Sequence, residues 1–210
     1  MEKNGFHNQK MSFFPCGNLA YGKFSKSQRN RGVIKKQTIT KTTTMTAYTL
    51  PHFGNLPLAN LEEYYDVELE FNGNRIQVDL NFENKTVDSS TMEKIKKILE
   101  NLDQFDKLNH AYMLDDYNDE DGDTVKFYLQ HHLEEVGEYE LSNLINLNDS
   151  TIEPEQQLLT QLKLVRVGLY PDGDDNFAIF DYSIGEEITN YLVVINTDEN
   201  GELDYMSMES

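Results

Sequence analysis

Residues 64–82 read YYDVELEFNGNRIQVDLNF, and this stretch decides the predicted fold. Apolar and polar side chains alternate on both sides of Asn72-Gly73. Because neighbouring side chains of a strand point to opposite faces, the alternation predicts two strands with one buried face, and Asn-Gly favours the type I′ turn of a β-hairpin. That turn predicts four cross-strand pairs: Val67 with Val78, Leu69 with Ile76, Glu70 with Arg75, and Asp66 with Asp79. The last pair sets two like charges opposite each other, which costs stability.

The hydrophobic period changes after this hairpin, and three helices are expected. Apolar residues recur at steps of three and four over 91–108, behind a capping box that starts at Ser90. An acidic loop then precedes a second helix, which Gly137 ends. A third, short helix begins at Pro154, since proline suits the first helical position.

Four short runs rich in Val, Ile, Tyr and Phe follow, separated by turns that contain glycine: 164–170, 177–184, 191–196 and 202–208. Consecutive strands joined by short turns form an antiparallel meander most economically. The sequence therefore predicts an α+β fold. We expect one antiparallel sheet, made of the N-terminal hairpin and the C-terminal four-strand meander, with two or three helices covering one face.

The distribution of charge divides the chain into two parts. The 210 residues include 18 basic and 37 acidic side chains, for a net charge of −19 and a pI near 4.5. Residues 1–45 have a net charge of +8, whereas residues 46–210 have a net charge of −27. The first part shows no sustained helical or strand period, so we expect a basic disordered extension over 1–45 and a single acidic α+β domain over 46–210.

Several roles stay open for the extension. Its basic, acid-poor composition resembles an organelle transit peptide, whereas Pro15 and Gly17 break its apolar stretch and disfavour a secretory signal. A basic arm that binds nucleic acid or folds back on the acidic domain is a third interpretation. In the simplest interpretation the extension has no role and does not belong to the natural protein, because Met45 stands where the charge switches.

The composition of the acidic domain excludes several classes of function. Nucleic acids and anionic lipids are held largely by Lys and Arg, so we expect neither nucleic-acid nor membrane binding by this domain. The single cysteine, Cys16, excludes an internal disulfide and suits a reducing compartment, which indicates a cytoplasmic protein. We expect no cofactor, because the sequence contains neither a phosphate-binding loop nor a dinucleotide-binding glycine motif.

Metal binding rests on weak patterns. His131, His132 and Glu135 lie within about one helical turn, but a transition-metal site needs three or four converging ligands, and His110 or Asp116 would have to complete this one. His132 also falls near an apolar stripe, which favours a partly buried position at the edge of the core. The acidic loop fails to match a calcium-binding loop, since its spacing places tyrosines at both end-ligand positions.

Asp181 interrupts an otherwise apolar predicted strand, between Phe180 and Tyr182. Among so many acidic residues, two carboxylates meet by chance, so no pair is singled out for acid–base catalysis. The plain interpretation is that Asp181 points out of the sheet. Arg166, on the first strand of the meander, is then its candidate partner.

A wider resemblance rests on the C-terminal runs. Residues 162–173 read LKLVRVGLYPDG, residues 177–185 read FAIFDYSIG and residues 191–194 read YLVV. With DLNF at 79–82 and YLQHHL at 128–133, these runs resemble an uncharacterised bacterial family catalogued as the domain of unknown function two thousand and four. The resemblance covers roughly residues 60–210 and implies an α+β fold in a soluble bacterial protein. It implies no activity and supplies no catalytic residues.

We therefore expect a non-catalytic acidic interaction module that binds a basic protein, as small proteins that neutralise a basic toxin do. The candidate partner-binding residues lie on the outer face of the hairpin and in the acidic loop: Asp66, Glu68, Glu70, Asp79, Asp115, Asp116, Asp119 and Asp121. One alternative is a metal-assisted hydrolase that uses His131, His132 and nearby acids. Another is that the acids only solvate the surface.

Overall fold

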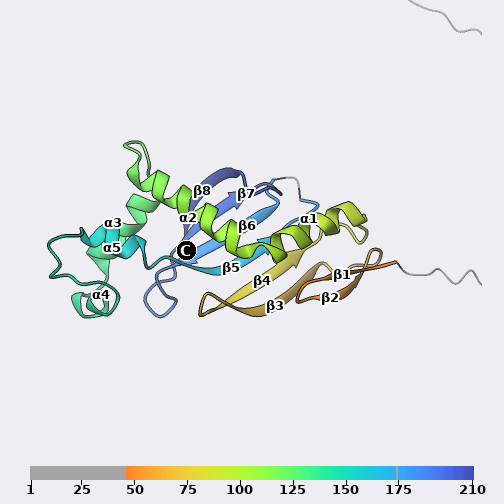
Figure 1. The fold of residues 1–210 in the computed structure, drawn as a ribbon, viewed down its shortest axis with the longest axis horizontal. Coiled ribbons are helices and arrows are strands. Elements are labelled where there is room, and N and C mark those ends of the chain that lie inside the picture. Colours follow the sequence, from red (N-terminus) through yellow and green to blue (C-terminus); the bar gives the residue numbers. More distant parts are fainter. Residues whose placement is uncertain (1–45, 174) are drawn as a thin grey trace, which may run out of the picture. The chain divides into compact units, whose positions relative to one another are not determined.

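The computed structural model describes residues 46–173 and 175–210, so the expected extension over 1–45 lies outside the described residues. The described residues form a six-stranded mixed sheet, a separate two-stranded sheet and five helices, which confirms the α+β class (Figure 1). In the large sheet the strands lie side by side in chain order: β3 (Tyr64–Phe71), β4 (Asn74–Asn81), β5 (Lys163–Leu169), β6 (Ala178–Ser183), β7 (Leu192–Thr197) and β8 (Leu203–Glu209).

The β3–β4 hairpin has the expected register, with all four predicted cross-strand pairs present. Asn72 and Gly73 have φ values of 48° and 79°, the left-handed values that a type I′ turn requires at both central residues. Ile76 and Val78 are buried, as the alternation predicted. The local hydrophobic period and the turn chemistry therefore set this register.

We expected one antiparallel sheet, but β4 and β5 pair in parallel, so the large sheet is mixed. The other neighbouring strands pair in antiparallel fashion. A tight turn joins only antiparallel neighbours, whereas β4 and β5 are separated in the chain by all five helices. The chain passes through this helical segment and re-enters the sheet at β5 in the direction of β4.

Two helices replace the single helix predicted over 91–108. α1 (Ser89–Glu100) and α2 (Leu102–Asn118) are separated by Asn101, whose Nδ2 donates to the Lys97 carbonyl at 2.7 Å. An asparagine side chain that bonds to nearby backbone competes with the helical pattern, which accounts for the break.

The remaining elements are α3 (Val125–Glu135), α4 (Glu138–Leu144), α5 (Pro154–Leu159), β1 (Ala47–Leu50) and β2 (Gly54–Pro57). Helix α5 begins at Pro154, as predicted, whereas Val136 is the C-cap of α3, and Gly137, expected to end that helix, is the N-cap of α4 with a φ of −62°. Helix α4 and the β1–β2 hairpin were not expected, because elements this short contain too few residues to show a period. The described residues therefore contain five helices rather than the two or three expected.

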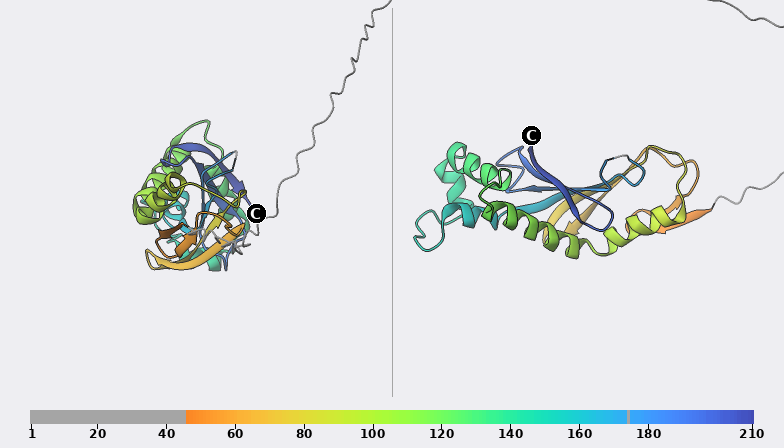
Figure 2. Two further views of the ribbon diagram at one scale, coloured as in Figure 1. Left: turned by 90° about the vertical axis from the view of Figure 1, so that its right-hand side faces the viewer. Right: turned by 90° about the horizontal axis from the view of Figure 1, so that it is seen from above.

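Helices α1 and α2 lie along one face of the large sheet, and α3, α4 and α5 gather near one end (Figures 1 and 2). Phe105 of α2 stacks on Phe180 of β6 with ring centroids 6.1 Å apart. An in-register row of apolar side chains crosses the sheet on this face: Val67, Val78, Val167, Phe180, Ile195 and Met206. Among the described residues, no helix runs along the opposite face, which we call the open face (Figure 2).

Within the two described ranges, none of the helices combines the length and the apolar character needed to cross a membrane.

Candidate functional site

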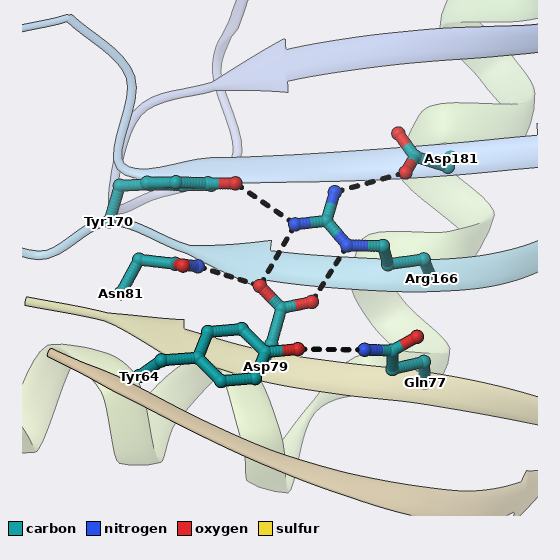
Figure 3. Close-up of polar contacts among 7 residues, drawn as sticks. All are labelled: Tyr64, Gln77, Asp79, Asn81, Arg166, Tyr170 and Asp181. Carbon is teal, nitrogen blue, oxygen red and sulfur yellow. Dashed lines mark hydrogen bonds and ion pairs between the residues drawn. The ribbon is translucent and has the colours of Figure 1, made fainter. Parts of the chain in front are cut away.

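The open face brings together charged side chains from several strands. The register places Glu68, Gln77, Arg166 and Asp181 in one row across β3, β4, β5 and β6. Because side chains alternate along a strand, Asp79 shares this face two positions beyond Gln77. Arg166 lies at the centre of the cluster (Figure 3).

Arg166 binds two carboxylates that belong to different strands. Its Nε and Nη2 donate to the two oxygens of Asp79 at 2.7 and 2.9 Å, and its Nη1 donates to Asp181 Oδ2 at 3.1 Å (Figure 3). Tyr170 Oη accepts a further hydrogen bond from Nη2 at 2.9 Å. Asn81 Nδ2 donates to Asp79 Oδ2 at 2.6 Å. The planar guanidinium thus joins β4, β5 and β6 through charge-assisted hydrogen bonds.

The three charged side chains of this network are largely removed from water. The side chains of Asp79 and Asp181 are 1% and 8% exposed, and that of Arg166 is 30% exposed. A carboxylate withdrawn from water is tolerated when an opposite charge and hydrogen bonds compensate it. The like-charge pair predicted in the hairpin is relieved in this way, because Arg166 neutralises Asp79 while Asp66 stays exposed.

Gly168 makes room for the guanidinium. A Cβ atom at this position would lie 2.6 Å from Arg166 Nη2 and 2.9 Å from Tyr170 Cε2. Both distances are shorter than non-bonded atoms allow, so any larger residue would displace the two side chains. The glycine in the β5 sequence is therefore part of the site, because its missing side chain lets Arg166 lie along the strand.

Burial and the shared guanidinium together set the protonation of the network. Burial raises the pKa of Asp181 above its ordinary value; Asp79 and Glu209 add to this, and Arg166 opposes it. Burial also acts against the charge of Arg166, but its hydrogen bonds to Asp79 and Tyr170 outweigh that effect and raise its pKa. Arg166 therefore stays charged, and two carboxylates share one positive charge.

Three of the expected partner-binding residues are exposed on the open face: Asp66, Glu68 and Glu70. Glu68 forms an ion pair with Arg75 at 3.3 Å, and both side chains are well exposed. The fourth expected residue of the hairpin, Asp79, is fully buried with both oxygens engaged. We therefore correct its assignment: Asp79 positions Arg166 and does not reach a partner.

Two of the four expected loop residues, Asp115 and Asp116, lie in the last turn of α2, and only Asp119 and Asp121 lie in the loop between α2 and α3. Asp116 Oδ2 accepts from the Val125 backbone N–H at 2.7 Å and so caps α3, and Asp119 Oδ1 accepts from the Asp121 N–H at 3.1 Å. Asp115 is exposed. Within the described residues, no hydrogen bond or ion pair joins this loop to the Arg166 network. Among the described residues, the structure thus joins only Asp79 of the eight expected partner-binding residues to that network by hydrogen bonds or ion pairs.

The paired histidines of α3 occupy an aromatic environment. His132 is buried, and its Nδ1 and Nε2 lie 2.6 Å from the Tyr128 carbonyl oxygen and 2.8 Å from Thr189 Oγ1. Because a carbonyl only accepts, Nδ1 carries the proton and the Thr189 hydroxyl donates to Nε2. Burial lowers the pKa of His132, and the neighbouring His131 adds to this. His131 packs edge-on against Tyr191 with ring centroids 4.9 Å apart.

His132 is fully buried, at 1% exposure, rather than partly buried at the edge of the core as expected, and both of its ring nitrogens are engaged. In the described part of the chain, no group of three or more His, Cys, Asp and Glu side chains is arranged to hold a metal ion. The weak candidates His131, His132 and Glu135 therefore do not form such a group. The hydrolase alternative has no ligand set among these residues.

A second polar cluster, which we did not predict, lies between α2 and β6. The Tyr182 hydroxyl donates to Asp106 Oδ1 at 3.0 Å and accepts from Asn109 Nδ2 at 3.2 Å. Burial, followed by the charge of Asp106, raises the pKa of Tyr182 well above its ordinary value. Asp106 and Asn109 lie at helical spacing inside an apolar stripe, and this interruption is the signal that sequence reasoning missed.

The sequence pointed to the Arg166–Asp181 pair, which the structure contains at 3.1 Å. It did not point to Asp79 as the main partner of Arg166, because only the parallel pairing of β4 with β5 brings these two residues together. Comparisons of the chain with models of protein families, with curated proteins and with solved structures found no match. The resemblance noted in the sequence stays a prediction, and the site is interpreted from its own geometry.

Proposed function

We propose that this protein is a non-catalytic, acidic interaction module that binds a basic protein and neutralises it, in the manner of an immunity protein against a toxin. The observation that supports this proposal most directly is the open face of the sheet, on which Asp66, Glu68 and Glu70 are exposed in a row along β3. Three carboxylates at every second position of an edge strand form a negative strip about 13 Å long, since a strand rises about 3.3 Å per residue.

The charge of the acidic part supports the same proposal. Residues 46–210 have a net charge of −27, and such an excess attracts cationic proteins over a distance of about 8 Å at physiological salt. Complementary potentials raise the rate of encounter and reject partners of like charge. A module that must find a basic effector quickly needs this property rather than a catalytic group.

The test is capture of partners by the full-length protein at two salt concentrations, with matched variants. One variant combines Asp66→Asn, Glu68→Gln and Glu70→Gln. Its control combines Asp115→Asn, Asp119→Asn and Asp121→Asn, which removes equal charge from the end of α2 and the loop after it. We expect a basic protein to bind the unmodified protein and the loop variant, to bind the hairpin variant at least about tenfold more weakly, and to dissociate at 1 M salt, where the screening length is about 3 Å.

Recovery of no basic protein, or binding that does not change with salt, would overturn the proposal. Equal weakening by the hairpin and loop variants would show that only the net charge matters, and would contradict the assignment of the binding surface to the open face. We also propose a cytoplasmic location, because the chain has a single cysteine, and membership of the family that the sequence resembles. The proposed binding of a basic protein depends on neither.

A further inference from the structure

We propose that the basic partner binds by adding an antiparallel strand to the free edge of β3. Its basic side chains lie on the open face, and its apolar side chains lie on the face along which α1 and α2 run, the helix face. This inference rests on the proposed function and specifies how the partner is held. Main-chain hydrogen bonds give such a complex its affinity, and the alternate side chains of the added strand give it specificity.

Strand β3 is a long edge strand with a neighbouring strand on one side only. It forms one end of the six-stranded sheet and pairs with β4 over all eight of its residues without a shift in register (Figure 1). Within the ranges that the structure describes, the backbone groups on its outer side form no hydrogen bond. A row of unpaired N–H and C=O groups is a template for a further strand.

The hydrogen bonds of the hairpin identify the residues of β3 whose backbone points outward. The Phe82 N–H donates to the Glu63 carbonyl oxygen at 2.9 Å. Because hydrogen-bonded and non-hydrogen-bonded pairs alternate along an antiparallel ladder, Glu63 and every second residue after it direct their backbone groups to β4. The N–H and C=O groups of Asp66, Glu68 and Glu70 therefore point to the free edge. The residues that carry the negative strip are thus the ones that offer backbone groups to a partner.

The helix face of β3 presents apolar side chains that the core covers only in part. Val67, Leu69 and Phe71 are partly buried and pack against the core, whereas Ile76 and Val78 on the neighbouring strand β4 are fully buried. An added strand would cover the exposed remainder of the three β3 side chains. Removing apolar surface from water favours such binding.

The two faces of β3 together define the chemistry of the added strand. In antiparallel pairing, the residues opposite Asp66, Glu68 and Glu70 have Cα atoms about 5.5 Å from theirs and side chains on the open face. Basic residues at these positions form favourable pairs with the three acids. The residues between them lie on the helix face, where apolar side chains contact Val67 and Leu69. The partner segment therefore alternates basic and apolar residues.

The charge of the strip also decides which strands are rejected. Two copies of β3 paired with each other would place carboxylates opposite carboxylates, which destabilises the pairing, so a second copy of the chain does not fit. Glu68 already contacts Arg75 at 3.3 Å, but both side chains are well exposed. An exposed pair of this kind contributes little, so a basic residue of the partner replaces it at small cost.

The opposite edge of the sheet, β8, is less suited to strand addition. Its pairing with β7 shifts in register between Asn196 and Thr197, and Thr124 Oγ1 donates to the Met206 carbonyl oxygen at 3.3 Å. A bulge and a cover from another segment are two devices that protect sheet edges. Among the described residues, β3 has neither device, so the inference concerns β3.

The first test adds an alternating peptide, acetyl-Lys-Val-Lys-Val-Lys-Val-Lys-amide, to the full-length ¹⁵N-labelled protein. We expect saturable changes in the amide signals of residues 64–71. A control peptide contains the same residues in the order Lys-Lys-Val-Val-Val-Lys-Lys, so its charge is equal and its alternation is lost. The control should bind about tenfold more weakly or less tightly still.

Methylation of the peptide nitrogens separates strand pairing from charge. In the antiparallel arrangement the lysine N–H groups of the alternating peptide face β3, whereas its valine N–H groups face solvent. The peptide methylated at its lysine backbone nitrogens should therefore bind about tenfold or more weakly, and the peptide methylated at its valines should bind within about threefold of the unmodified one. Equal binding of the two methylated peptides would overturn the inference, and loss with the valine-methylated peptide alone would contradict the antiparallel direction.

The protein side of the pairing is tested at Glu68. Glu68→Pro removes an N–H that points to the free edge and that β4 does not use, and proline is tolerated at such positions of edge strands. Glu68→Gln is the matched control, because it removes the same charge and keeps the N–H. We expect the proline variant to bind the alternating peptide about tenfold more weakly than the glutamine variant. Equal affinities of two folded variants would overturn the inference.

Amide exchange gives a readout that needs no variant. Bound alternating peptide should slow the solvent exchange of the Asp66, Glu68 and Glu70 amides at least about tenfold, because each gains an acceptor. The Val67 and Leu69 amides already face β4 and should change less. Signal changes without slowed exchange at the three outward amides would show contact by charge alone and would contradict strand addition.

The native basic partner separates this inference from the proposed function. If that partner binds in a salt-dependent way but Glu68→Pro and Glu68→Gln bind it equally, strand addition is wrong and the proposed function stands. If the alternating peptide pairs with β3 but no basic protein is recovered, strand addition stands and the proposed function fails.

Discussion

Arg166 and Asp79, 87 residues apart in the chain, are joined by two hydrogen bonds of 2.7 and 2.9 Å across a pair of parallel strands. Helices α1 and α2, which belong to the helical segment that separates them in the chain, lie along the opposite face of the sheet (Figure 2). This contact therefore links the β3–β4 hairpin to the C-terminal strands β5–β8. The local sequence cannot specify the pairing of β4 with β5. The first prediction concerns its contribution to stability.

Substitution Asp79→Ala should lower the free energy of unfolding by about 3 kcal/mol, because removing one partner of a buried ion pair leaves the other charge uncompensated. Urea unfolding followed by circular dichroism measures the change. The control is Glu68→Gln, which breaks the exposed pair with Arg75 and should cost less than about 1 kcal/mol. Equal effects of the two substitutions would contradict a structural role for the buried pair.

Gly168→Ala should destabilise the protein by about 1–3 kcal/mol, since the added methyl group overlaps Arg166 Nη2 and the Tyr170 ring and forces both to move. Gly173→Ala is the matched control, because a Cβ atom there meets no atom nearer than 3.7 Å, and its effect should stay within about 0.5 kcal/mol. Thermal unfolding of both variants is sufficient. A neutral result at residue 168 would show that the guanidinium has space to rearrange.

Tyr182→Phe should lower the free energy of unfolding by about 1–3 kcal/mol, because it removes the hydroxyl that donates to Asp106 Oδ1 and leaves Asn109 Nδ2 without its acceptor. Tyr139→Phe, at a tyrosine that is 77% exposed, should change nothing measurable. Denaturant unfolding of the two variants gives the comparison. If Tyr182→Phe is as stable as the unmodified protein, the hydroxyl network between α2 and β6 contributes no stability.

Stability should fall as the pH drops below about 6.5, the ordinary pKa of histidine, because of His132. Burial lowers its pKa in the folded protein, so the unfolded chain binds the proton first and its protonation favours unfolding. The stability that neutral His132 contributes is fully present above the pKa that this histidine has in the unfolded chain. It is lost as the pH falls through the lower pKa that His132 has in the folded protein.

The measurement for His132 is the unfolding free energy at pH 8 and pH 5.5. The unmodified protein should lose stability between them by up to about 1.4 kcal/mol per pH unit below 6.5. His132→Gln, which has no titrating ring, should show a smaller loss. Identical pH dependence in the two proteins would assign the effect to other groups.

Sequence reasoning succeeded where the decisive contacts are local. The turn residues Asn72 and Gly73 and the alternation around them determine the hairpin register, since shifting the pairing by one residue would expose Ile76 and Val78. The start of α5 at Pro154 is equally local. The break at Asn101 was missed because a single side-chain bond to the Lys97 carbonyl outweighed a helical period that continues through it.

The amino-acid sequence by itself determined that this chain contains an acidic α+β domain, where its main strands lie, and that Asp181 and Arg166 belong on one face. Tertiary structure alone decided that β5 pairs in parallel with β4, and with that pairing the role of Asp79. Its carboxylate looked like an exposed contact because its alternation with apolar neighbours puts it on the outer face of the hairpin. It is buried because a strand 87 residues later brings a guanidinium to it, and no local pattern encodes a contact whose partner arrives from so far along the chain.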